Sequence, residues 1–264
     1  MHRVFRPISI LAGCAIMMMV TACNGIFEDI YDEAPATANV TTEGQLLVNA
    51  ASWKDWYYVD FDSLQMYIER KDTAGLLKAQ TNFTHYAIPT NLTSGSGDGK
   101  TGMYTYWFDV FGKGISVNEK RGFTATDAQL EPQSWSIAFH RNNVRTNGGA
   151  VLETKYTSLS ELPKNSSYFL GATFQEDEWT ENEVWEDQSQ MLSSLIGCQG
   201  IKINKVLSSW LKIEIPPMPP SFTMNSHVFI LRLKNGKYAA LQLENYIGTD
   251  GTKCWLRINY KYPY

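Results

Sequence analysis

Short segments of β-branched and aromatic residues alternate with polar turn segments from Gln45 to the end of the chain. Such segments are typical of β-strands. The expected strands cover residues 46–49, 56–61, 104–110, 135–140, 149–156, 201–206, 210–215, 227–233, 237–244 and 253–260. Short strands at regular spacing predict an all-β protein, a domain made mainly of antiparallel β-sheet.

Three segments add detail to this pattern. Asn235-Gly236, between the expected strands 227–233 and 237–244, is a strong signal for a two-residue hairpin turn. Residues 91–103 contain Ser-Gly-Ser-Gly-Asp-Gly, which is typical of a flexible loop. Residues 184–195 include a run with poor strand propensity, so we expect a short helical or irregular insertion there.

The N-terminus has the features of a lipoprotein signal peptide. Two arginines precede the apolar stretch 8–20, which is shorter than the roughly 20 residues that a membrane span needs. The sequence Val-Thr-Ala-Cys then places a lipidation motif at Cys23. A second such motif ends at Cys14, but cleavage there would leave almost no apolar core before it. An ordinary signal peptide, in which Cys23 is incidental, is the alternative.

These features predict three parts: a signal peptide at 1–22, a lipidated N-terminus and polar tether at 23–44, and a folded domain at 45–264. Several acyl chains on Cys23 would suffice for stable anchoring. We therefore expect an outer-membrane lipoprotein that is exposed at the cell surface and can also be shed.

Composition narrows the possible functions. The formal net charge is −4, which gives no reason to expect a nucleic-acid partner. Enzyme motifs are absent: the sequence has no Gly-x-Ser-x-Gly, no His-Glu-x-x-His and no phosphate-binding loop. We therefore expect a binding protein and not an enzyme. Cys198 and Cys254 could form a disulfide outside the cytoplasm or stay as two separate thiols, and the sequence leaves both open.

The stretch Trp135 to Leu152 reads WSIAFHRNNVRTNGGAVL. It resembles the signature of the HmuY-like family of haem-binding surface lipoproteins, in which a Trp-x-Ile-Ala-Phe-His-Arg strand leads through a turn to Gly-Gly-Ala-Val. The segments 53–61 and 210–213 resemble an early aromatic strand and a late Trp-Leu strand of the same family. The similarity extends over about 45–264, and the part from 64 to 103 looks like an insertion.

The resemblance implies that two side chains bind haem iron from opposite sides of an apolar groove, two His in some members and two Met in others. His140 lies in the signature strand, where the family has no ligand, and His85 and His227 lie elsewhere. Alignment on Trp210 places the second His of the His-type members near Ile215, which cannot bind iron. The resemblance therefore favours a Met pair.

Met218 is framed by prolines in Pro-Pro-Met-Pro-Pro, a stiff segment suited to presenting a side chain. Met191 lies where the first ligand of the family is expected. We predict Met191 and Met218 as axial ligands of haem iron, although either could instead be a packed structural Met. Met66, Met103 and Met224 are weaker candidates. Phe222 could provide apolar wall for the porphyrin.

Thioether sulfur is soft and neutral, and it suits haem iron in the ferrous state. The resemblance implies a protein that captures haem, with host haemoproteins or other haem carriers as sources, and passes it to a TonB-dependent outer-membrane receptor. The alternative is a non-enzymatic surface β-sandwich that binds a glycan or a protein through exposed aromatic side chains. That alternative predicts no Soret band when the protein is mixed with haemin.

Overall fold

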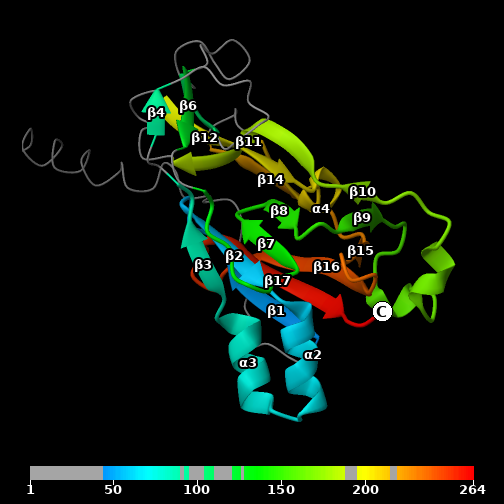
Figure 1. The fold of residues 1–264 in the computed structure, drawn as a ribbon. Helices are drawn as coiled ribbons and strands as arrows, with labels where there is room; N and C mark the ends of the chain where they lie inside the picture. Colours follow the sequence, from blue (N-terminus) through cyan, green and yellow to red (C-terminus); the bar gives the residue numbers. More distant parts are fainter. Residues whose placement is uncertain are drawn as a thin grey trace, which may run out of the picture.

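The computed structural model describes residues 44–89, 92–94, 104–109, 121–125, 128–187, 195–214 and 219–264 (Figure 1). Within these ranges every strand pairing is antiparallel, and the strands form four sheets. The predicted all-β class is confirmed. None of the described helices combines the length and the apolar character needed to cross a membrane.

The largest sheet has six strands and carries most of the core. Its order is β1 (Gln45–Asn49), β17 (Lys253–Lys261), β16 (Tyr238–Ile247), β15 (Phe229–Arg232), β9 (Ala150–Glu153) and β10 (Gln175–Glu176). The predicted turn between β15 and β16 is confirmed. Gly236 has a φ of 82°, a conformation that glycine adopts without strain, and its N–H donates to the Leu233 carbonyl at 2.9 Å.

A four-stranded sheet packs beside it, in the order β3 (Thr84–Ala87), β2 (Asp55–Val59), β7 (Ile137–His140) and β8 (Asn143–Thr146). β7 and β8 are buried along their whole length. The family signature implied a turn between the strand that ends at His140 and Gly148-Gly149, but residues 143–146 form the strand β8. Partners elsewhere in the sequence, Tyr58 for Arg145 and Asp177 for Thr146, bind polar groups of β8, and this allows polar residues to form a buried strand.

The five-stranded sheet has the order β11 (Glu178–Asp187), β12 (Leu195–Ile203), β5 (Tyr104–Asp109), β6 (Arg121–Ala125) and β4 (Leu92–Ser94). A two-stranded sheet consists of β13 (Leu211–Glu214) and β14 (Ser221–Met224). The helical or irregular insertion expected at 184–195 was wrong for 184–187, which continue β11, and for Leu195, which begins β12. Pairing of Val184 with Gln199 outweighs weak propensity there, and a shift in register interrupts the ladder between Thr180 and Val184. Residues 188–194 lie outside the described ranges.

Helices are few and short in the described ranges: α2 (Phe61–Glu69), α3 (Thr73–Thr81), α4 (Lys205–Ser208) and the 3-10 turns η3 (Leu159–Glu161) and η4 (Ser166–Phe169). Asp60 and Asp72 cap α2 and α3, each accepting a backbone N–H of the first turn. Both helices lie at one end of the molecule and the five-stranded sheet at the other (Figure 1).

The core fills the space between the six-stranded sheet, the four-stranded sheet and α2. Its largest fully buried side chains are Trp210, Phe61, Phe139 and Phe229, whereas the equally buried Trp56 belongs to a second apolar cluster. Burying a large apolar side chain contributes on the order of 1.5–3 kcal/mol. The signature residues of β7 therefore lie at the centre of the protein.

Candidate functional site

Met191 and Met218 both lie outside the described residues, but the strands on either side of each are described. Met191 falls between β11 and β12, which pair antiparallel, and Met218 falls between β13 and β14, which also pair antiparallel. We call β11–β12 the first hairpin and β13–β14 the second hairpin. Each predicted ligand thus belongs to the segment that joins the two strands of one hairpin.

The two hairpins follow each other in the chain and share a single connector, residues 204–210. Asn204 begins it and is fully buried. Its side-chain oxygen accepts the Leu207 N–H at 2.9 Å and so caps α4. Its amide group donates to the Gln175 carbonyl at 2.9 Å and to Asp177 Oδ1 at 3.2 Å. Its backbone N–H donates to the Val144 carbonyl of β8 at 2.8 Å.

Asp177 directly precedes β11 and joins the first hairpin to β8. Its Oδ2 accepts the backbone N–H of Thr146 at 2.7 Å, and its Oδ1 accepts the Thr146 hydroxyl at 2.9 Å. Burial raises the pKa of Asp177. The hydrogen bonds from Thr146 and Asn204 and the positive charge of Arg145 lower it, but by less. The carboxylate is thus held in place by several donors at the cost of partial desolvation.

The rest of the connector also docks on the signature strands. Ser208 Oγ accepts the Val144 N–H at 2.9 Å. The ring of Trp210 stacks on Phe139 of β7, and its indole N–H donates to the Asn142 carbonyl at 3.3 Å. The signature segment therefore anchors the connector from which both hairpins extend.

The second hairpin is also held through its second strand, β14. Phe222 of β14 stacks on Tyr246 of β16, with ring centroids 5.6 Å apart and an angle of 8° between the planes. The Lys253 ammonium lies 5.5 Å from the Phe222 ring and 5.4 Å from the Tyr246 ring. Phe222, which we expected in the porphyrin wall, thus packs at least partly against the six-stranded sheet.

The described histidines belong to neither hairpin. His140 is 1% exposed, and its Nδ1 lies 3.1 Å from the Asp55 carbonyl oxygen. His85 lies in β3 beside Asp55, and His227 Nδ1 lies 2.8 Å from Glu153 Oε1. Across the described part of the chain, no three His, Cys, Asp or Glu side chains gather in a way that could hold a metal ion.

Arg145 of β8 is a buried cation that our sequence reasoning did not single out. Its guanidinium lies 5.0 Å from the Trp135 ring and 4.9 Å from the Trp56 ring, and it donates to the Tyr58 hydroxyl. Glu131 pairs with it at 3.0 Å. Burial raises the pKa of Tyr58 to about 12. Trp56, Tyr58 and Trp135 form one apolar cluster that also contains Val184, Ile201 and Ile203 of the first hairpin. These three aromatic rings therefore support the base of that hairpin.

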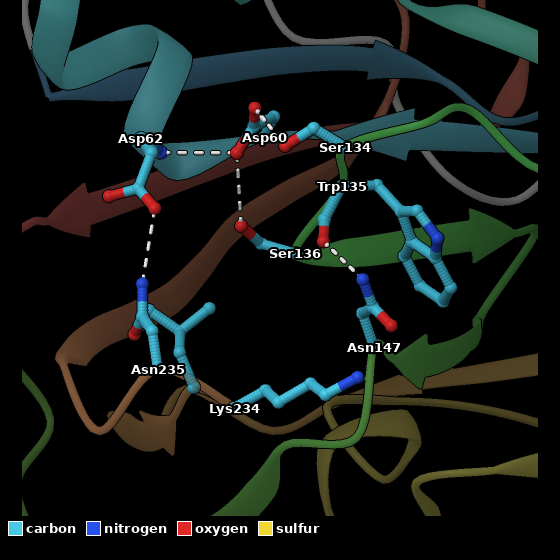
Figure 2. Close-up of a pocket in the computed structure, with 9 residues that line it drawn as sticks. Asp60, Asp62, Ser134, Trp135, Ser136, Asn147, Lys234 and Asn235 are labelled. Atoms are coloured by element: carbon cyan, nitrogen blue, oxygen red, sulfur yellow. Dashed lines mark hydrogen bonds between the residues drawn. The ribbon is translucent and has the colours of Figure 1, made fainter.

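A small pocket lies between the start of α2, the start of β7 and the β15–β16 turn (Figure 2). Its volume is about 220 Å³, below the roughly 300–1,000 Å³ of typical small-molecule sites. Its polar groups bind one another: Asp60 accepts the Ser134 hydroxyl at 2.9 Å, and Asn235 donates to Asp62 at 3.1 Å. It lacks the broad apolar walls that a porphyrin needs, so it is not a candidate haem site.

Three of the solved structures that resemble this one are compared with it. A Bacteroides vulgatus protein described as HmuY-like and haem-binding has a TM-score of 0.53 and 26% identity, over 83% of this chain and 91% of that one. A Bacteroides fragilis protein described as a lipoprotein has a TM-score of 0.55 and 24% identity, over 83% and 90%. The apo HmuY analogue of Tannerella forsythia has a TM-score of 0.53 and 20% identity, over 87% and 97%. The last two likenesses bear on the fold alone.

No curated protein sequence matches the chain significantly. The model of the HmuY family, described as HmuY protein, matches residues 52–260, which is most of the chain. The match includes the signature strands, the connector and both hairpins. The resemblance noted in the sequence is thereby confirmed, and the chain belongs to the HmuY family.

Proposed function

We propose that this protein is a haem-binding surface lipoprotein that captures haem through Met191 and Met218. Family membership supports haem as the ligand, as does the Bacteroides vulgatus protein that is described as haem-binding. The observation that carries the proposal is the arrangement of the two hairpins. They share one connector anchored on buried strands, and each has one of the two methionines in its joining segment.

The chemistry of the chain agrees with this assignment. Haem is the cargo here, and its iron accepts soft thioether sulfur as an axial ligand. His85, His140 and His227 lie outside the two hairpins in the chain: His140 is buried in the core, and the side chains of His85 and His227 lie beside carboxylates. Met224, by contrast, lies within β14 and not in the segment that joins the two strands of the second hairpin.

The cellular role follows from the family and from the N-terminus. Residues 1–22 would be removed, Cys23 would carry lipid, and 23–44 would tether the domain 45–264 to the outer membrane. The protein would take haem from host haemoproteins or other carriers and pass it to a TonB-dependent receptor. In this role it is a binding protein without an enzymatic step.

A second candidate is a surface protein that binds a glycan or a protein. The observation in its favour is the exposure of Tyr168 and Leu170, which are 66% and 73% accessible in and beside η4. This function needs neither methionine. It predicts that haemin produces no Soret band with the purified protein.

The test is a titration of the mature protein with haemin, followed by visible absorption before and after dithionite. We expect the wild type to give a Soret band of bound haem, shifted and sharpened relative to that of free haemin, with weaker binding in Met191→Ala and in Met218→Ala and almost none in the double variant. Met224→Ala is the matched control, because it removes an exposed methionine of the second hairpin, to which Met218 also belongs. This variant should bind haem like the wild type. Absence of the Soret band, or silence of both methionine changes, contradicts the proposal.

A further inference from the structure

Three parts of the chain meet at Asp177. It directly precedes β11, it accepts two hydrogen bonds from Thr146 of β8, and it accepts one from Asn204 at the start of the connector. Asn204 is itself 0% exposed and bonded to the backbone of β8. The beginning of the first hairpin and the connector that follows this hairpin are therefore fixed to the same buried strand.

The length of the first hairpin makes this attachment important. β12 has nine residues, from Leu195 to Ile203. A strand of that length extends about 30 Å, so a rotation of about 2° at its base moves its far end by about 1 Å. Ligand positions need to be held within about 0.5 Å of their productive geometry. The second hairpin is less sensitive, because its strands have four residues each and Phe222 holds it directly.

We propose that Asp177 is a positioning residue for haem ligation. By holding the start of β11 and the connector on β8, it sets where the far end of the first hairpin, with Met191, stands relative to the second hairpin, with Met218. The inference rests on the proposed function, because it concerns the two segments that would carry the ligands. Asp177 lies at the start of the first hairpin, before β11, and acts only through the strands.

The substitution that tests this is Asp177→Asn. An amide keeps the size of the side chain but replaces one acceptor oxygen with an NH₂ group, which cannot accept from Thr146 or Asn204. We expect the apo protein to stay folded by circular dichroism. The ferrous haem complex should lose its sharp α and β bands, and haem should dissociate about tenfold faster, the lower end of the effect of groups that orient metal ligands.

Asn204→Ser is the second variant, in case the first does not fold. Serine still caps α4 but loses the amide donor to Asp177 and Gln175, so we expect the same spectral change to a smaller degree. Asp60→Ala is the control: it removes the cap of α2, at the other end of the molecule, and should lower the unfolding midpoint with an unchanged haem spectrum.

The outcomes separate the two proposals. No Soret band from the wild type overturns the proposed function and this inference with it. If the wild type binds haem and Asp177→Asn has the same haem bands and the same rate of haem dissociation, this inference alone is overturned. If Asp177→Asn does not fold, unchanged bands and an unchanged rate in Asn204→Ser overturn it. Changed bands in the variant that folds, together with an unchanged spectrum in Asp60→Ala, support the positioning role.

Discussion

The indole ring of Trp210 lies nearly parallel to the phenyl ring of Phe139, with centroids 5.7 Å apart and an angle of 9° between the planes. Both side chains are 0% exposed. Phe139 belongs to the signature strand β7, and Trp210 ends the connector just before β13. This stacked pair joins the part of the chain that identifies the family to the part that leads into the second hairpin.

The pair gives a direct prediction about stability. Phe139→Ala or Trp210→Ala should each lower the free energy of unfolding by about 3–5 kcal/mol, the usual cost of removing a buried aromatic side chain. Tyr168→Ala, which removes an exposed ring, should change it by no more than about 0.5 kcal/mol. Urea unfolding followed by tryptophan fluorescence and circular dichroism measures these values. A loss below about 1 kcal/mol for either buried ring contradicts this description of the core.

Much of the sheet could be predicted because strand propensity and turn residues are local properties. Strand propensity and turn residues directly predict β15, β16 and the turn at Gly236. β8 could not be predicted in this way. Arg145 and Thr146 are polar, and they are buried there because Glu131, Tyr58 and Asp177 provide their partners. No local pattern reveals these partners.

The helices and the site show the same limit. α3 and most of α2 fall in a region that we interpreted only as an insertion, and Phe61, which we expected to end a strand, begins α2. Capping residues such as Asp60 and Asp72 were available as signals. Asp177 and Asn204 stand 27 positions apart and carry no motif, so only the folded chain identifies them as one anchor. The roles of Met191 and Met218 stay predictions, because both residues lie outside the described ranges.

Arg145 should be sensitive even to a conservative change. Lys cannot reproduce a planar guanidinium that lies against aromatic rings while it bonds to Tyr58 and Glu131. We expect Arg145→Lys to cost about 1–3 kcal/mol of unfolding free energy. Glu131→Gln should cost at most about 1 kcal/mol, because that carboxylate is 40% exposed. Equal stabilities of the wild type and Arg145→Lys, measured by urea unfolding, would show that the guanidinium has no specific role.

Asp62 gives a prediction about acid stability. Its Oδ1 accepts a hydrogen bond from the Lys237 ammonium at 2.6 Å and another from the Tyr262 hydroxyl. Mainly the hydrogen bond from Lys237 holds the pKa of Asp62 below its ordinary value. Its stabilising effect is therefore complete above its ordinary pKa of about 3.9 and is lost as pH falls through the lowered value.

Asp62→Asn tests this directly. The side chain is 49% exposed, so the loss of unfolding free energy at neutral pH should be no more than about 1 kcal/mol. Wild type and variant should converge in stability at pH values below the lowered pKa. Urea midpoints between pH 7 and the acid limit measure this, and Lys237→Met should remove part of the same difference. A gap that stays constant down to the lowest pH contradicts the assignment.

Cys23 gives a prediction about membrane anchoring. Its motif directly follows the apolar stretch 8–20, whereas the motif at Cys14 interrupts that stretch. Cys23→Ser should therefore release the protein from the membrane fraction or block its maturation, because no acyl chains can be attached. Cys14→Ser should fractionate like the wild type. Unchanged membrane retention in Cys23→Ser, assessed by fractionation and immunoblotting, would rule out the lipid anchor.

The two proposed thioether ligands predict a dependence on redox state. Both are neutral and soft, so they favour ferrous iron, whereas ferric iron gains more from harder or anionic donors. Reduction should therefore tighten haem binding and sharpen the α and β bands of a six-coordinate low-spin complex. A His-ligated member of the family should take haem from this protein under oxidising conditions and lose part of that advantage under dithionite. Haem transfer between the two proteins, measured in both states, provides the test. Equal affinity in the two states argues against Met191 and Met218 as a pair, even if the protein binds haem.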